Sequence, residues 1–292
     1  MAALGLIGPG TLLSQARQRS LWVSVVDRSG APVLNLQPSD LAVREDDRAR
    51  EILRVSPADE PMQIAVLVDN SQAAQPVIAD IRRALGPFVE ALTAPSSSGT
   101  RHTVALITLA ERPRILADYT SDRAELAKAI ALVWSNSQVG NAAYLLDAIL
   151  EVTKGFTIRE AARPVIVAIM SEGPELSWRD ARPVLAALTE TSAAFHVVGI
   201  GIPSGDISEE ARNRNIVVED GPRLTGGLRD QLLTGLALPA KLLQIADVLT
   251  HQYRVTYAQP DQLVPPERMV VSARRADLVA RGTPIKEARG RR

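Results

Sequence analysis

The chain has 292 residues, of which 46% are hydrophobic, enough to bury a core in one large domain or two smaller ones. Lysine and arginine number 33, as do aspartate and glutamate, so the chain carries no net charge that would attract nucleic acid or acidic lipid. The absence of cysteine excludes disulfides, thiol catalysis and thiolate zinc sites. No charge-free run of about 18 apolar residues occurs, so we expect no integral membrane segment in this sequence.

Residues 1–20 contain a short apolar stretch that ends in small and polar residues. Secretory signals end in this way, although the positively charged first segment of such a signal is missing here. Two interpretations stay open, the remnant of an export signal and a disordered N-terminal arm. The first predicts a periplasmic or extracellular location.

Residues 21–55 alternate apolar and polar side chains, with turn signals at 27–30 and 45–47. This period of two predicts short antiparallel strands. The polar, proline-containing segment 56–61 then predicts a linker.

The period changes after the linker. Continuous apolar runs occur at 64–68, 104–109, 165–170 and 195–200, and runs of this kind are typical of strands buried on both faces of a parallel sheet. The segment 112–119 predicts a further strand, joined to the second run by a tight turn.

Helical patterns separate these runs. They lie at 75–92, at 121–133 with Ser121 as N-cap, at 141–155 ending at Gly155, at 177–192 with a late start or kink from Pro183, and at 227–252 with a break at Pro239. Alternating strands and helices predict an α/β fold, with a doubly wound, mostly parallel sheet and helices on both faces.

The last part of the chain returns to the alternating pattern, at 252–260 and 267–275. We therefore expect both chain ends to pair into one small antiparallel β unit, because neither end can bury its apolar face alone. The predicted organisation is a β unit from 21–60 and 252–278, an α/β domain at 62–251 and a basic, disordered tail at 279–292.

Polar residues follow the buried strands. The stretch QIAVLVDNSQAAQP, residues 63–76, ends its apolar run with Asp69 and Ser71, and Glu172 follows another run. Asn141 precedes a predicted helix and could supply a third loop. Ligands of open α/β sheets bind outside the carboxyl ends of the strands, so these residues mark a candidate site.

These motifs together resemble a von Willebrand factor A (VWA) domain with its metal-ion-dependent adhesion site. The resemblance spans about residues 62–252 and includes Thr-Gly-Gly at 225–227. The alternating segments before and after this region resemble bacterial VWFA-related proteins, in which a small β unit flanks the A domain.

In that family two serines, a threonine and two aspartates hold one Mg²⁺, directly or through water. The resemblance places the first aspartate at Asp69, the first serine at Ser71 and the later aspartate at Glu172. The second serine falls on Ala73, which has no side-chain oxygen, and the position nearest to the threonine is Asn141. Mg²⁺ requires oxygen ligands in octahedral array, so the resemblance implies a degenerate site.

A structural role is the alternative for Asp69 and Ser71, since both could cap the helix predicted from Gln75. Asn70 and Trp178 are candidate residues of a binding rim. An exposed Trp178 would be a binding anchor, whereas a buried one would pack the start of its helix.

Other signals are weak. The Gly-x-Gly at 199–201 is followed by Pro203 and opens no helix, and no Walker A or G-x-S-x-G sequence occurs. The three histidines, His102, His196 and His251, show no ligand spacing.

We therefore predict a non-enzymatic protein–protein interaction module of VWA type with a degenerate adhesion site, no catalytic residue and no cofactor. The expected partner is a protein and not nucleic acid, and the sequence leaves the identity of the partner and the oligomeric state open. The first alternative is a Mg²⁺-dependent adhesion domain that uses Asp69, Ser71 and Glu172, and the second is a hydrolase that uses residues of the rim.

Overall fold

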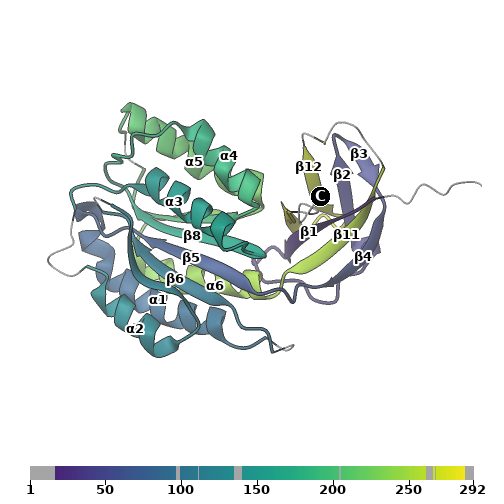
Figure 1. Cartoon of the computed structure of the whole chain (residues 1–292), viewed down its shortest axis with the longest axis horizontal. Coiled ribbons are helices and arrows are strands. Elements are labelled where there is room, and N and C mark those ends of the chain that lie inside the picture. Colours follow the sequence, from purple (N-terminus) through teal and green to yellow (C-terminus); the bar gives the residue numbers. More distant parts are fainter. Residues whose placement is uncertain are drawn as a thin grey trace, which may run out of the picture.

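The computed structural model describes residues 17–96, 99–110, 112–134, 140–203, 205–260, 266 and 268–286. It has two lobes, an α/β lobe and a smaller β unit that contains both the first and the last described strands (Figure 1). No helix in these described ranges is long and apolar enough to cross a membrane.

A six-stranded sheet forms the centre of the α/β lobe, in the order β10-β9-β8-β5-β6-β7. The four apolar runs predicted from the sequence lie side by side and parallel as β9, β8, β5 and β6, and β7 pairs antiparallel at one edge. The strand bounds are Met62–Val68 (β5), Thr103–Thr108 (β6), Arg114–Thr120 (β7), Arg163–Ser171 (β8), Ala194–Ile200 (β9) and Arg229–Leu232 (β10).

Helices cover both faces of this sheet (Figure 1). In β5, Ile64, Val66 and Val68 pack toward one helical layer, while Ala65 and Leu67 pack toward the other. Because successive side chains of a strand point to opposite faces, both faces of a central strand must be apolar. One layer holds α1 (Ile78–Thr93), α2 (Arg123–Leu132) and α6 (Leu238–Thr250), and the other holds α3 (Leu145–Ile158), α4 (Ala181–Thr191) and α5 (Glu209–Thr225). The predicted doubly wound fold is confirmed.

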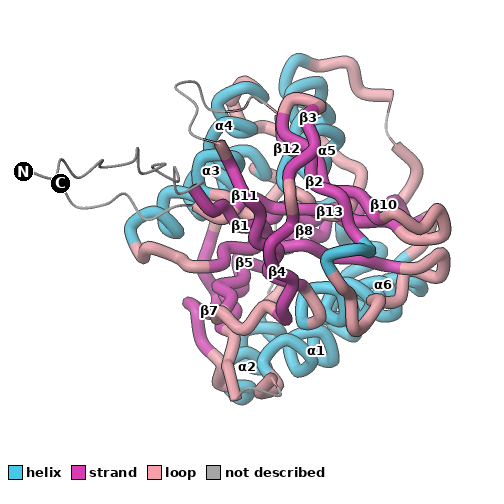
Figure 2. The backbone as a smooth tube through the Cα atoms, turned by 90° about the vertical axis from the view of Figure 1, so that its right-hand side faces the viewer, coloured by secondary structure: helices cyan, strands magenta, loops and turns pink. Residues whose placement is uncertain are grey.

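The β unit consists of two small sheets, ordered β13-β1-β11-β4 and β12-β2-β3 (Figure 2). β1 pairs antiparallel with both β11 and β13, so the two ends of the chain share one unit, as predicted. A separate apolar core lies between the sheets and includes Leu21, Leu41 and Val255. The strand bounds are Arg17–Val26 (β1), Leu41–Glu45 (β2), Arg48–Arg50 (β3), Ile52–Pro57 (β4), Tyr253–Gln259 (β11), Met269–Ala273 (β12) and Val279–Pro284 (β13).

The expected disordered ends are wrong where the structure describes them. Residues 17–20 belong to β1, and residues 279–284 form β13. β13 is a strand because β1 offers it a hydrogen-bonding edge, and because the Thr283 hydroxyl donates to the Thr225 carbonyl at 2.6 Å. Residues 1–16 and 287–292 lie outside the described residues.

The helix predicted at 227–252 is also wrong in its first part, where the chain forms β10 before α6 begins at Leu238. Gly227 explains the difference, because a Cβ at this position would lie 1.8 Å from the Phe195 carbonyl oxygen. The chain therefore passes directly against β9 and pairs with its edge.

Two predicted helix ends differ as well, and one start is confirmed. α3 continues through Gly155 to Ile158, and α2 is capped by Asp122 rather than Ser121, since the Asp122 carboxylate accepts from the amides of two first-turn residues. α4 starts late, at Ala181, as Pro183 predicted.

Arg163 joins the two lobes. Its side chain is buried, and its Nη2 donates to the Leu249 carbonyl at 2.8 Å and to Gln252 Oε1 at 2.7 Å. Gln252 in turn donates to the Ser24 hydroxyl of β1, and the guanidinium lies 5.2 Å from the centre of the Trp22 ring. Burial lowers the pKa of Arg163 to about 10, so it remains a cation at neutral pH.

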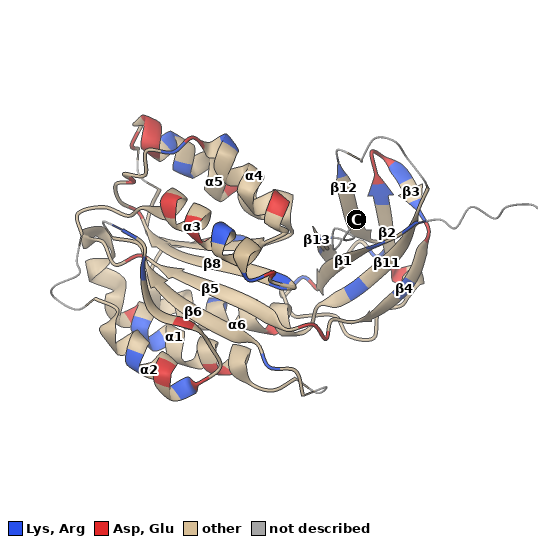
Figure 3. Ribbon diagram, viewed as in Figure 1, with Lys and Arg blue, Asp and Glu red and all other residues tan. Residues whose placement is uncertain are grey.

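Acidic and basic residues are interspersed along α1, α2, α4 and α5 (Figure 3). Both helical layers therefore mix residues of opposite charge, as does the chain as a whole.

Candidate functional site

Asp69 lies directly after β5 and connects two strand ends. Its Oδ1 accepts from the Ser71 amide at 2.8 Å, and its Oδ2 accepts from the Ser171 amide at 3.0 Å. Burial raises the pKa of the Asp69 carboxyl, while these two amides, the nearby Ser71 hydroxyl and the positive charge of Arg214 act to lower it. Both carboxylate oxygens are therefore engaged by the backbone.

The hydroxyls of Ser71 and Ser171 flank this carboxylate. Both are buried, and neither has a hydrogen-bond partner among the described residues. Ser71 precedes a 3-10 turn, Gln72–Val77, without a side-chain cap, so the expected capping role of its hydroxyl is wrong. The carboxylate of Asp69 engages the Ser71 amide instead of amides within the helix.

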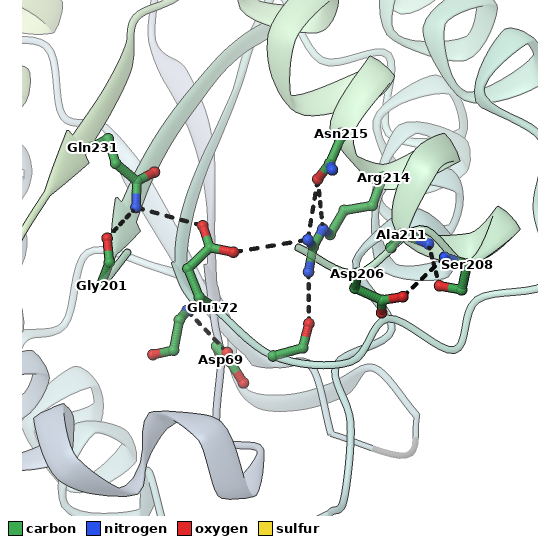
Figure 4. Close-up of polar contacts among 11 residues, drawn as sticks. Asp69, Glu172, Gly201, Asp206, Ser208, Ala211, Arg214, Asn215 and Gln231 are labelled. Carbon is green, nitrogen blue, oxygen red and sulfur yellow. Dashed lines mark hydrogen bonds and ion pairs between the residues drawn. The ribbon is translucent and has the colours of Figure 1, made fainter. Parts of the chain in front are cut away.

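The Glu172 carboxylate points away from Asp69 and is held by two side chains from other elements (Figure 4). Gln231 Nε2 lies 3.5 Å from Glu172 Oε1 and also donates to the Gly201 carbonyl at 2.8 Å. Arg214 Nη2 lies 3.8 Å from Glu172 Oε2. The negative charge of Glu172 is thus balanced by a cation within the chain.

Arg214 projects from α5 and is 4% exposed. Its Nη1 donates to the Gly173 carbonyl at 2.7 Å, and its Nε and Nη2 donate to Asn215 Oδ1 (Figure 4). These contacts hold the guanidinium beside the loop that follows β8. Arg214 was not predicted from the sequence because residues 209–225 were assigned no helix, although the Ser208 N-cap, the acidic first turn and Gly226 after the last turn are helix signals.

The loop at Gly140 and Asn141 also reaches this edge of the sheet. The Gln72 amide donates to the Gly140 carbonyl at 2.9 Å, next to Ser71. Asn141 itself is exposed, and its side chain makes no hydrogen bond with any residue in the described part of the chain. The structure therefore brings the predicted third loop to Ser71 without directing the Asn141 amide into the site.

The oxygen donors at this edge are fewer than the adhesion motif supplies. Each oxygen of Asp69 accepts from one amide, Glu172 lies beside Arg214, and Ala73 has no side-chain oxygen. Within the described residues, no three His, Cys, Asp or Glu side chains gather as a metal-binding group. Asp69 with the Ser71 and Ser171 hydroxyls is therefore an incomplete set for a cation that requires octahedral oxygen ligands.

Glu175 is a second buried carboxylate near this edge, and no pattern in the sequence indicated it. Its Oε2 accepts from the Leu145 amide at 3.2 Å and its Oε1 from the Ser177 amide at 3.0 Å, so it ties the loop after β8 to the start of α3. Burial raises the pKa of Glu175 to about 7.

Of the two residues predicted for the rim, one is buried and the other is exposed. Asn70 is buried and accepts from the Ala110 amide at 2.8 Å, so its side chain is no rim residue. Trp178 is 85% exposed, which excludes its packing against the start of α4. Ile202 and Ile207, in the loop after β9, are 78% and 83% exposed.

The histidines lie away from this site. His102 Nδ1 accepts from the amide of Met62, at the start of β5 and therefore at the opposite end of the sheet from Asp69. His196 Nδ1 accepts from the Leu228 amide, and His251 pairs with Asp247 after the end of α6.

Comparison with known proteins defines the fold class. No model of a known protein family and no curated protein matches the chain. A von Willebrand factor type A structure from Catenulispora acidiphila matches with a TM-score of 0.52 at 11% identity, covering 95% of this chain and 74% of that chain.

Proximal thread matrix protein 1 from the mussel byssus, solved with a zinc-occupied MIDAS motif, matches with a TM-score of 0.53 at 12% identity, covering 71% of this chain and 50% of that chain. Another crystal form of the mussel protein matches with a TM-score of 0.51 at 10% identity and the same coverage. The chain thus spans about half the length of the mussel protein. It has the fold of a VWA domain, as the sequence motifs predicted.

Proposed function

We propose that this protein is a non-enzymatic protein-binding module of VWA type, whose rim engages its partner without a metal ion. The observation that carries the proposal is the pairing of Glu172, the residue at the later acidic position of the adhesion motif, with Arg214 and Gln231. A fixed guanidinium supplies the positive charge that a cation would otherwise bring to this loop.

Exposed apolar side chains support a binding role for the rim. Trp178 follows β8 and Ile202 and Ile207 follow β9, so all three project from loops after neighbouring parallel strands. Large exposed apolar residues on such loops are typical of protein-binding surfaces, and a tryptophan is often the anchor.

The surroundings of Ser71 support a non-enzymatic role. Nucleophilic catalysis by Ser71 would need a base that is poised to take its proton, and none of the three histidines lies at this edge of the sheet. The Asp69 carboxylate beside Ser71 is buried, and each of its oxygens accepts from an amide, so it connects two strand ends. This arrangement favours the binding module over a hydrolase.

The test is capture of a partner from a lysate of the source organism on the immobilised chain, with and without chelator. We expect the same captured protein in both conditions, loss of capture with Trp178→Ala, and full capture with Ile158→Ala. Ile158 is a matched control because it is 73% exposed at the other end of α3. Capture that requires a divalent cation would support the Mg²⁺-dependent alternative, and turnover of a substrate would support the hydrolase.

A further inference from the structure

A cavity of about 350 Å³ lies between the two lobes, far from the rim in the fold. Its walls come from β1 and the following turn, from β13, from the Gly226–Gly227 turn after α5, and from α6. Gly226 has φ +74°, and a Cβ there would lie 2.5 Å from the Gly282 carbonyl oxygen of β13, so the lobes meet closely beside the cavity. Cavities at such junctions, of this size, are common positions for small-molecule sites.

His196 of β9 presents a buried donor in the cavity wall. The residue is 2% exposed, and its Nδ1 accepts from the Leu228 amide at 3.2 Å. Since Nδ1 accepts, the proton of the neutral ring is on Nε2. Nε2 is buried and has no hydrogen-bond partner in the described part of the chain. A buried donor without an acceptor raises the free energy of the folded protein. We therefore expect a ligand or a water to accept a hydrogen bond from this atom.

Arg281 of β13 provides a cation in the same wall. It is partly buried, and its side chain makes no hydrogen bond or ion pair with any described residue. His196 and Arg281 both line the cavity, and burial lowers the pKa of Arg281. At neutral pH the pair is one cation beside one neutral donor, since the pKa of His196 is lowered to about 4.

The other charged groups of the wall are engaged or exposed. Lys241 pairs with Asp230 and donates to Gln244, and Asp27 Oδ1 accepts from the amides of Ser29 and Ala31. Arg28 is exposed. Apolar side chains complete the lining: Val26, Leu228, Ile245 and Val248.

We propose that this inter-lobe cavity binds the carboxylate of a small organic acid, with Arg281 as its counter-ion and His196 Nε2–H as its hydrogen-bond donor. A guanidinium matches the planar geometry of a carboxylate. One cation and one neutral donor match the single negative charge of a carboxylate. The apolar walls match an aliphatic or aromatic group attached to that carboxylate. This site is independent of the proposed function of the rim.

Calorimetric titration of the full chain tests the proposal, with butyrate and benzoate as probes and butyramide and benzamide as neutral matches. We expect at least one acid to bind at least tenfold more tightly than its amide. Arg281→Gln should weaken that binding at least tenfold, whereas Arg44→Gln, which removes an exposed arginine of the same β unit, should leave it unchanged. Failure of both acids to bind, or equal binding by Arg281→Gln, would overturn the proposal. Equal affinity for inorganic phosphate would overturn the assignment to a carboxylate.

Nitrogen-15 NMR of the histidine rings provides a second readout on the natural chain, which does not depend on whether a variant folds. We expect His196 to be the Nε2–H tautomer and its Nε2–H resonance to shift on addition of the acid that binds. A His196 ring protonated on Nδ1, or an Nε2–H resonance that saturating acid leaves unmoved, would show that this donor does not contact the ligand.

Discussion

Arg214 Nη2 lies 3.8 Å from Glu172 Oε2, which places a fixed cation beside the loop that follows β8. The two residues are far apart in sequence and meet because α5 packs beside this loop (Figure 4). In a metal-dependent adhesion site the corresponding acidic group would face a bound ion. Here it faces a guanidinium, which supports the proposal that the rim binds its partner without a metal ion.

We expect the melting temperature of the natural chain to be unchanged by millimolar Mg²⁺ or by chelator. The combined variant Ala73→Ser, Glu172→Asp and Arg214→Gln restores two ligands and removes the competing cation, so it should gain a Mg²⁺-dependent rise by linkage. The same variant with Asp69→Ala is the control and should lose that response. A Mg²⁺-dependent rise in the natural chain that Asp69→Ala abolishes would contradict the metal-free rim.

Trp22 and Trp178, two of the three tryptophans, should differ in their effect on stability. Trp22 is 4% exposed and contacts Arg163, whereas Trp178 is 85% exposed. We expect Trp22→Ala to lower the free energy of unfolding by about 3 to 5 kcal/mol, and Trp178→Ala to change it by less than about 0.5 kcal/mol. Urea denaturation measures both values. A large loss with Trp178→Ala would mean that this side chain supports the fold and is no anchor for a partner.

Glu175 predicts a specific pH dependence. Burial raises its pKa from 4.5 to about 7, so between these values the folded chain binds more protons than the unfolded chain, and the free energy of unfolding falls as the pH rises. His102 and His196 act in the opposite direction, because burial lowers their pKa values from 6.5 to about 4.

Comparison of Glu175→Gln with the natural chain isolates this contribution. The stability of the variant relative to the natural chain should rise between pH 4.5 and about 7 by about 1 to 3 kcal/mol. Glu151→Gln, at an exposed position of α3, should show no such rise. If the free energies of unfolding of Glu175→Gln and of the natural chain changed in parallel with pH, the elevated pKa of Glu175 would be refuted.

The contacts of Arg163 at the junction of the two lobes should stabilise the folded protein. Arg163→Met removes the donors to Leu249 and Gln252 at the junction and leaves these acceptors buried. We expect a loss of about 3 kcal/mol in the free energy of unfolding. Arg159→Met, which breaks an exposed pair with Asp118, should cost less than about 1 kcal/mol. Equal losses in the two variants would show that the junction contributes no special stability.

The sequence by itself determined the central sheet and the existence of the β unit. Its apolar runs are continuous where strands are buried on both faces, as at Ile64–Val68, and alternate where one face is exposed, as at 253–259. Such patterns are local, so they can be interpreted without knowing the neighbours. For the same reason the sequence placed Asp69 and Ser71 correctly at the end of a buried strand.

The tertiary structure decided the elements and contacts that depend on a neighbour. β10 has the polar sequence RDQL and is a strand because β9 offers an edge, and β13 is a strand because β1 does. The state of the candidate site was decided in the same way. Whether Glu172 faces a metal ion or a guanidinium depends on where α5 places Arg214, and the long-range packing that places it leaves no periodic pattern in the sequence.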